Sequence, residues 1–342
     1  MADIIARKEG RAGRLTFARP AALNALNHQM ATAIETALDD WRHDPSVDLV
    51  LIDAMGERAF CTGGDIAAMY HAGRAGDHTV SHEFFAEEYR MNASIAEFPK
   101  PIVAFMQGFV MGGGVGVGGH ASHRIVGDST QMAMPESGIG LVPDVGGTLL
   151  LARAPGALGE YLGITGTRMG AGDAIHANFA DTYLPEAKWD ALKARLIATG
   201  NPTIIQGTPA PASALAALAP QIDAAFSAPD LAAIIGRLTR TDSDFATDTL
   251  TLIRRNSPLS MAATLALVRM TRADPTIRAA LSREYRFTRR ATAMGDFLEG
   301  VRAQIIDKDR RPVWRHTLAT LRPEDVAQML EPLGPEAAIW RD

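Results

Sequence analysis

The sequence is poor in several residue types, and each shortage argues against a class of protein. It has one cysteine, Cys61, in 342 residues, so no disulfide can form within the chain, which favours a reducing compartment. Basic residues are not in excess, because 34 lysines and arginines stand against 39 acidic residues, giving a net charge of −5. That balance disfavours nucleic acid and anionic membranes as partners. We therefore expect a cytoplasmic protein with neither kind of partner.

Hydrophobic runs suited to a membrane are also missing, although hydrophobic residues make up 47% of the chain. The uncharged stretch 101–123 is long enough to cross a bilayer, yet it contains seven glycines and one proline. It predicts a buried strand followed by a glycine-rich turn instead. The first ten residues mix acidic and basic side chains without an apolar core, so we expect no signal peptide.

Several signatures of catalysis and cofactor binding are absent as well. The chain has no GxSxG, HExxH or GxxxxGK[ST] motif. His120 and His123 have helical spacing, but no third ligand lies near them in the sequence. The run Gly114–Gly119 matches GxGxxG, yet the acidic residue expected about 20 positions later is not in place. We expect neither a metal nor a bound cofactor.

The first 180 residues alternate between strand-like and helix-like patterns, which is typical of an α/β fold. Apolar runs at 49–54 and 101–105 predict buried strands, and RLTFAR, RIV and QMAM predict shorter ones. Apolar residues recur at helical spacing over about 28–42, and a mostly helical stretch is expected from about 66 to 97.

The composition changes near residue 200. The segment 201–213 contains three prolines and reads as a linker, and periodic segments follow near 212–226, 229–240, 258–270 and 276–291. A chain of this length is expected to form about two domains. We expect a catalytic core over 1–200 and a helical region over 201–342.

Twelve of the 31 glycines lie between Gly108 and Gly147. In AFCTGGD and MGGGVG, glycines follow a predicted strand, where a tight turn or a helix start leaves backbone N–H groups free. Two such N–H groups that meet at one point would form an oxyanion hole, which stabilises the negative charge of a tetrahedral intermediate. The alternative is that both segments are ordinary turns and closely packed helix starts.

Two carboxylates, Glu136 and Asp144, lie in the apolar and glycine-rich segment AMPESGIGLVPDVGGT, with no other charge between them. Burial of such groups raises the pKa of a carboxyl, which suits general acid–base catalysis. The alternative is that each one caps a turn or a helix, and Asp144 directly precedes the predicted helix VGGTLLLA.

Three segments, AFCTGGDI, VMGGGVGVG and AMPESGIGLVPDVGG, together resemble the enoyl-CoA hydratase/isomerase (crotonase) superfamily, and within it most closely the 3-hydroxyisobutyryl-CoA hydrolases. Further segments that resemble the family occur along the chain in the order expected for it: ARPAALNALN, FFAEEYRMN, SREYR and EGVRAQIIDKDRRPVW. The resemblance covers nearly the whole chain. It implies an α/β fold, a crotonase-like spiral of ββα units with a helical C-terminal region.

The resemblance also implies roles for individual residues. The N–H groups of Gly64 and Gly113 match the pair that holds the thioester oxygen of an acyl-CoA in that family. Glu136 matches one catalytic glutamate of the family's hydratases, whereas the other falls on Gly116, which has no side chain. Asp144 stands where hydratases usually have glycine and the hydrolases have aspartate. Glu136 and Asp144 are thus the implied catalytic residues.

Substrate-binding residues are implied in the same way. Glu88 matches a substrate-side glutamate of the hydrolases and is expected to line the acyl pocket. The CoA adenine is expected over the turn and backbone formed by Gly63, Asp65, Ile66, Ala22 and Leu23. Family members often have a basic residue where this chain has Ala21. Contacts to the CoA phosphates must therefore come from elsewhere, and the candidates are the arginines at 283, 286, 289 and 290, which alternatively form a solvated helix face.

Hydrolysis of a CoA thioester, with 3-hydroxyisobutyryl-CoA as the expected substrate, is the activity that the resemblance implies. A hydratase or isomerase of the same fold is the alternative. No cofactor is expected, because CoA is part of the substrate. Members of the family form homo-oligomers, so a homo-oligomer is also an expectation for this chain.

Overall fold

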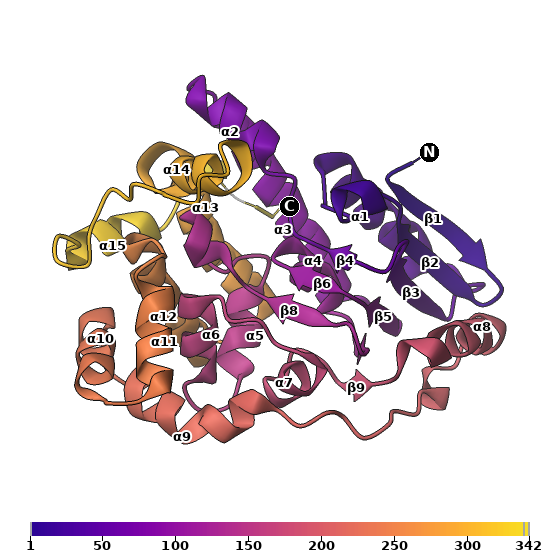
Figure 1. The fold of residues 1–342 in the computed structure, drawn as a ribbon. Helices are drawn as coiled ribbons and strands as arrows, with labels where there is room; N and C mark the ends of the chain where they lie inside the picture. The colour runs from indigo at the N-terminus through magenta and orange to yellow at the C-terminus, as the bar shows by residue number, and fades with distance from the viewer. Residues whose placement is uncertain (1, 338, 341–342) are drawn as a thin grey trace. The chain divides into compact units, whose positions relative to one another are not determined.

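The computed structural model describes residues 2–337 and 339–340, which form two compact units (Figure 1). The sheet unit comprises residues up to 65, 87–133 and 168–214; the helical unit comprises 66–86, 134–167 and the chain from 215 onwards. Each unit is thus assembled from three separate stretches of sequence. The expected division into 1–200 and 201–342 stays a prediction.

The sheet unit contains two sheets whose strands are parallel, except for the antiparallel pair β1–β2. The six-stranded sheet has the order β1 (Ile4–Glu9), β2 (Ala12–Phe17), β3 (Leu49–Ala54), β5 (Ile102–Met106), β7 (His123–Val126) and β9 (Thr182–Tyr183). The three-stranded sheet has the order β4 (Ala59–Cys61), β6 (Phe109–Met111) and β8 (Gln131–Ala133). The strands predicted from the apolar runs are confirmed.

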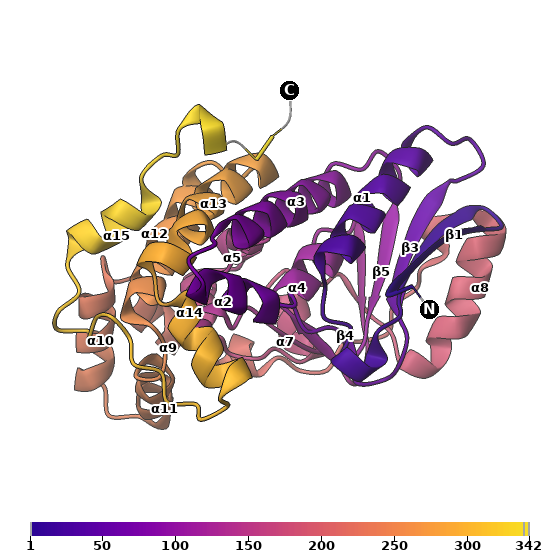
Figure 2. The same ribbon diagram turned by 90° about the horizontal axis from the view of Figure 1, so that it is seen from above.

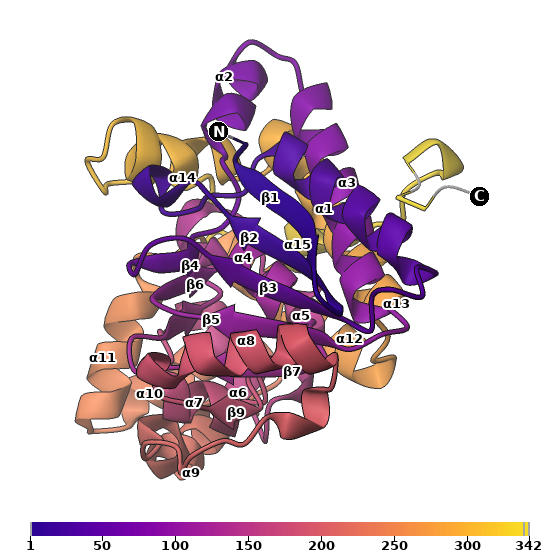
Figure 3. The same cartoon turned by 90° about the vertical axis from the view of Figure 1, so that its right-hand side faces the viewer.

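Helices α1 (His28–Arg42) and α8 (Trp189–Thr199) cover opposite faces of the six-stranded sheet (Figures 2 and 3). The predicted helix over 28–42 is confirmed, and it begins at Asn27, whose side chain accepts the Met30 N–H. Beneath α8 lies a continuous apolar core: Ala12, Leu49, Leu51, Val103, Phe105, Ile125, Leu184, Trp189, Leu192 and Leu196. Burial of this apolar surface is what holds the helix on the sheet.

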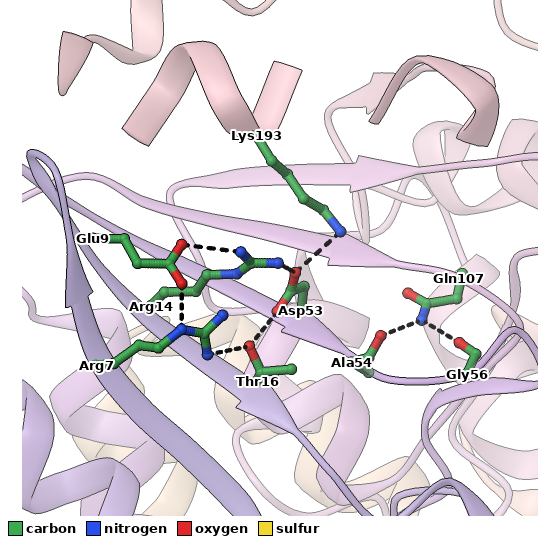
Figure 4. A network of polar contacts seen from close by, with 9 residues as sticks. All are labelled: Arg7, Glu9, Arg14, Thr16, Asp53, Ala54, Gly56, Gln107 and Lys193. Atoms are coloured by element: carbon green, nitrogen blue, oxygen red, sulfur yellow. Dashed lines mark hydrogen bonds and ion pairs between the residues drawn. The ribbon is translucent and has the colours of Figure 1, made fainter. Parts of the chain in front are cut away.

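A polar network interrupts that face of the sheet (Figure 4). Asp53 at the end of β3 is buried and accepts hydrogen bonds from Arg14 and Thr16, and Lys193 of α8 lies 3.0 Å from it. Burial alone would raise the pKa of Asp53, but the Arg14 hydrogen bond and the Lys193 charge hold that pKa below its usual value. The network therefore joins α8 to the sheet by charge as well as by apolar contact.

The helical unit is built around α12 (Pro258–Ala273), which packs against α5 (Gly147–Arg153) and α6 (Leu158–Thr165) (Figure 1). The four helices predicted beyond residue 210 are confirmed as α9 (Ala214–Phe226), α10 (Leu231–Arg240), α12 and α13 (Ile277–Met294). The sequence pattern did not predict α11 (Asp244–Ile253), α14 (Phe297–Val301), the π-helical turn η5 (Arg302–Ile306) or α15 (Pro323–Leu330).

The remaining α-helices lie in the first half of the chain, apart from one that begins at Ala171. The stretch 66–97, predicted to be mostly helical, forms α2 (Ala67–Arg74) and α3 (Thr79–Ala96). The other α-helices are α4 (Gly113–Gly118) and α7 (Ala171–His176). Short 3-10 turns include η1 (Pro20–Ala22) and η2 (Glu136–Ile139). Helix α3 contains the point at which the chain passes from the helical unit to the sheet unit. Over residues 2–337 and 339–340, every helix is too short or too polar to span a membrane.

Candidate active site

The first backbone donor, Gly64, lies in the turn that follows β4. Gly63 has a φ of +100°, a conformation open to glycine and strained for other residues. The Gly63 carbonyl accepts the Leu26 N–H, and the Asp65 N–H donates to the Leu26 carbonyl, both at 2.8 Å. This pairing makes a parallel bridge between Leu26 and Gly64. Because neighbouring peptide groups alternate in direction, the Gly64 N–H points away from Leu26.

The second donor, Gly113, is the first residue of α4, directly after β6. Gly112 precedes it with a φ of +47° and turns the chain from the strand into the helix. The first N–H groups of a helix have no partner within it. The helix start predicted in MGGGVG is therefore confirmed.

These two turns lie directly against each other. A Cβ atom added to Gly113 would lie 3.4 Å from the Gly64 nitrogen, and one added to Gly114 would lie 2.3 Å from the Cys61 carbonyl oxygen. Among the described residues, neither the Gly64 N–H nor the Gly113 N–H donates a hydrogen bond. The two turns can approach this closely only because glycine has no side chain. Two free N–H groups side by side are suited to binding the oxygen of a polarised carbonyl. Their role as an oxyanion hole stays a prediction.

Glu88 of α3 reaches the same place. Its side chain is buried, and a Cβ atom added to Gly113 would lie 2.5 Å from the Glu88 Oε1 atom. The structure thus places a carboxylate beside the second backbone donor. The expected substrate-side role of Glu88 stays a prediction.

The segment expected under the CoA adenine is joined to the same turn. Leu23 follows η1 with a φ of +51°, and its carbonyl accepts the Thr62 hydroxyl at 3.3 Å. Asn24 is buried and donates from Nδ2 to the Met55 and Ala59 carbonyls. Of the predicted binding residues, Ala22, Leu23, Gly63 and Asp65 therefore belong to one region of the sheet unit. Ile66 is the first residue of the helical unit.

Cys61 ends β4 beside this turn and is fully buried. Burial raises the pKa of its thiol to about 12, and the nearby charge of Glu88 acts in the same direction. A thiol with so high a pKa is a poor nucleophile near neutral pH. Its position supports a packing role.

Both predicted catalytic carboxylates are buried in the helical unit, Glu136 at 5% exposure and Asp144 at 4%. Glu136 begins η2, and the next residue, Ser137, donates its hydroxyl to the Gly163 carbonyl and accepts the Ser257 N–H through its own carbonyl. Gly116, which replaces the other hydratase glutamate, lies buried in α4 and presents no acid.

Asp144 lies at the first position of an unusual turn. Val145 and Gly146 both have left-handed backbones, with φ of +55° and +75°, and the Gly147 N–H donates to the Asp144 carbonyl at 2.6 Å. Left-handed backbone is uncommon for a β-branched residue and is strained. The N-cap residue of α5 is Gly146, so Asp144 does not stand at the N-cap position of this helix, and its role stays a prediction.

Reasoning from the sequence missed Glu284, which lies in the SREYR segment on α13. It is fully buried and accepts the N–H groups of Gly146 and Thr148 and the Thr148 hydroxyl. Burial raises its pKa to about 8 against the opposing effect of these hydrogen bonds, and the charge of Asp144 adds to the rise. The signal was present: an acid at position 284 interrupts the buried stripe of α13.

The arginines considered for the CoA phosphates are engaged elsewhere. Arg283 pairs with Asp274 at 2.6 Å, and Arg289 lies 3.5 Å from the Tyr285 hydroxyl. Arg286 and Arg290 donate to carbonyls at the C-terminal end of α15, where the helix dipole favours positive charge. These contacts favour a structural role. Three or more potential metal-binding side chains do not cluster anywhere in the parts of the chain that the structure describes.

Comparison with known proteins gives a consistent family assignment. The family model described as Enoyl-CoA hydratase/isomerase matches residues 12–330. Among curated proteins, "3-hydroxyisobutyryl-CoA hydrolase, mitochondrial" of Gallus gallus is 36% identical, with 97% of this chain and 90% of that protein covered, and the protein of that name in Homo sapiens is 34% identical, with 97% and 89% covered.

Solved structures agree with that assignment. An enoyl-CoA hydratase from Rhodobacter sphaeroides has a TM-score of 0.95 and 55% identity, with 98% of this chain and 99% of that chain covered. A carnitinyl-CoA dehydratase from Mycobacterium thermoresistibile has a TM-score of 0.94 and 41% identity, with 99% of each chain covered. The crotonase-like fold is confirmed, and the protein is an enzyme that acts on CoA thioesters. The chain belongs to the enoyl-CoA hydratase/isomerase family.

Proposed function

We propose that the protein hydrolyses the thioester of 3-hydroxyisobutyryl-CoA, releasing 3-hydroxyisobutyrate and free CoA, a step of valine breakdown. One observation carries the proposal. The sheet unit has two free backbone donors and no acid at position 116, and the helical unit has two buried carboxylates, Glu136 and Asp144. The addition of water by two glutamates needs that acid. The names of the curated relatives support the choice of substrate.

In the proposed mechanism, the N–H groups of Gly64 and Gly113 bind the thioester oxygen and stabilise the negative charge that forms on it. A preformed donor of this kind contributes about 3–4 kcal/mol of transition-state stabilisation. At position 113 a Cβ atom would lie 2.5 Å from the Glu88 Oε1 atom and 3.4 Å from the Gly64 nitrogen, so glycine keeps the space beside both donors open.

Glu136 provides the attacking group by one of two routes. As a general base, it takes a proton from water while the water oxygen bonds to the carbonyl carbon. As a nucleophile, it bonds to that carbon itself, and water then hydrolyses the resulting anhydride. In either route the carbon–sulfur bond breaks, and Asp144 orients the substrate hydroxyl or the water and helps protonate the leaving thiolate. Glu88 lines the acyl pocket in this proposal.

A hydratase or isomerase is the second candidate, because a solved structure described as an enoyl-CoA hydratase is 55% identical to this chain. The two candidates differ in whether the carbon–sulfur bond breaks. Hydrolysis frees a thiol, whereas hydration or isomerisation leaves the thioester intact and only removes or moves a carbon–carbon double bond.

The decisive experiment uses the purified full-length protein with 3-hydroxyisobutyryl-CoA, 3-hydroxypropionyl-CoA and crotonyl-CoA. Free thiol is measured with a chromogenic thiol reagent, and loss of the crotonyl double bond is measured by ultraviolet absorbance. We expect thiol release from the hydroxyacyl substrates, with the branched one favoured. If the crotonyl absorbance falls while no substrate yields thiol, the hydrolase proposal is wrong.

The proposal includes four further points from the sequence. Turnover needs no cofactor or metal, so thiol release is expected to survive dialysis against a chelator. Neither nucleic acid nor a membrane is a partner. The chain forms a homo-oligomer, which sedimentation would test. The protein acts in the cytoplasm, although the curated relatives carry the word mitochondrial in their names; cell fractionation separates these locations.

A further inference from the structure

The turn that carries Asp144 is held by a residue far away in the sequence. Glu284 is fully buried on α13, and its two carboxylate oxygens each accept a backbone N–H of this turn: Oε2 from Gly146 at 2.8 Å and Oε1 from Thr148 at 3.0 Å. Oε1 also accepts the Thr148 hydroxyl. One carboxylate thus fixes the turn at two backbone positions.

The turn has a particular need for such support. Val145 and Gly146 are consecutive left-handed residues, and Val145 is β-branched, so its backbone is strained. Strained conformations persist where surrounding contacts enforce them. The N-cap residue of α5, Gly146, has no side chain that could accept the N–H of Thr148, the second residue of the helix. Glu284 accepts this N–H instead, from another helix.

The charge of Asp144, two residues before Gly146, acts on Glu284. The Thr148 hydroxyl that donates to Glu284 also lies 3.2 Å from the Thr271 hydroxyl. Burial of a carboxyl group costs free energy unless hydrogen bonds replace those that the group makes with water. Its hydrogen bonds here go to the backbone directly after Asp144.

We propose that Glu284 is a positioning residue that holds the Asp144–Gly146 turn, and with it the Asp144 carboxylate, in the conformation needed for thioester hydrolysis. The inference rests on the proposed function. Glu284 itself is not assigned contact with the substrate. It acts through the backbone of Gly146 and Thr148.

The first test is Glu284→Gln. Both oxygens of the Glu284 carboxyl group accept a backbone N–H, whereas an amide has only one oxygen. Either orientation of the amide therefore turns its NH2 group toward one of these donors and loses that hydrogen bond. A misplacement of about 1 Å in a catalytic group typically costs about 100-fold in rate. We therefore expect a loss of kcat of about that size in thiol release, with little change in KM.

The Asp144→Asn background separates positioning from general stability. If Glu284 acts through Asp144, then Glu284→Gln lowers kcat in the wild-type chain but has almost no further effect on the Asp144→Asn variant. Glu160→Gln is the matched control, because Glu160 is an equally buried glutamate of the helical unit that pairs with Arg272 at 2.5 Å. We expect that control to lower the melting temperature and to leave kcat unchanged.

A milder variant covers the case in which Glu284→Gln does not fold. Thr148→Val removes only the hydroxyl that donates to Glu284, and we expect a smaller loss of kcat that again disappears in the Asp144→Asn background. The inference is overturned if these variants keep their kcat, or lose it equally in both backgrounds. If the wild-type protein releases no thiol at all, it is the proposed function that fails.

Discussion

At the scale of single residues, the proposed site depends on the lack of a side chain at position 113. A Cβ atom there would lie 2.5 Å from the Glu88 carboxylate and 3.4 Å from the Gly64 nitrogen. Cβ atoms do not approach other atoms as closely as the first of these distances, so something must move. Both neighbours belong to the proposed substrate site, and alanine at this position is expected to disturb the chemistry before it disturbs the fold.

Alanine keeps the backbone N–H, but its Cβ atom is expected to displace this donor from the substrate oxygen. Gly113→Ala is therefore expected to lower kcat for thiol release by roughly 100- to 1,000-fold, the effect known for an oxyanion donor that no longer reaches its acceptor. Gly170→Ala is the matched control in the same unit, because no atom lies within 4 Å of a Cβ added there. Equal activity of the two variants would remove Gly113 from the proposed mechanism. Circular dichroism checks that both variants remain folded.

Glu136→Gln replaces the proposed base or nucleophile with an amide of the same shape. The amide neither accepts a proton from water nor attacks the thioester, so thiol release is expected to fall by two or more orders of magnitude. CoA binding, measured by calorimetry, should remain. Turnover near the wild-type level would exclude Glu136 from the mechanism.

At the scale of elements, α13 and α5 are joined by a buried ionisable group, and this makes the stability of the helical unit depend on pH. Burial raises the pKa of Glu284 to about 8 from an ordinary value of 4.5. Between these two values the unfolded chain has lost the Glu284 proton while the folded chain retains it. The unfolded state then binds fewer protons than the folded state, so rising pH favours unfolding.

The free energy of unfolding is thus expected to carry a contribution from Glu284 that is fully present below about pH 4.5 and is lost as the pH rises to about 8. The slope of this single-proton contribution is at most about 1.4 kcal/mol per pH unit. Urea unfolding across that range measures it. The Glu284→Gln variant should lack the slope, and identical pH profiles for the two proteins would contradict the prediction.

Local pattern explains why many elements could be predicted from the sequence. The predicted bounds of helix 28–42 and strand 49–54 agree with the structure to within a residue or two, because hydrophobic periodicity depends on a few neighbouring positions. The two glycine turns could also be found, since a strand followed by glycines marks a backbone conformation. The Glu284–Thr148 contact could not, because 136 positions separate its partners and no local pattern links them.

At the scale of the whole molecule, both units are interleaved along the chain. Helix α12 packs against α5 and α6, which precede it by about a hundred residues. Its buried face includes Leu259, Met261 and Leu265. These side chains would lose their apolar neighbours in a fragment that begins at residue 201.

The fragment 201–342 is accordingly expected to lack a cooperative thermal transition on its own. The residues 134–167 supply α5 and α6, so a chain in which they are joined to 215–342 by a flexible linker should recover part of the helical structure. Circular dichroism and heat-induced unfolding compare the two. A cooperative transition for 201–342 alone would support an independent domain over that range.

The buried Cys61 has a practical consequence. Its thiol pKa of about 12 leaves roughly one molecule in ten thousand as thiolate at pH 8, and it is fully shielded from solvent. The native protein is therefore expected to react very little with thiol reagents. An assay that counts liberated CoA would read substrate turnover without a background from the protein, and a cysteine introduced at a chosen surface position would accept a spectroscopic label at that position alone.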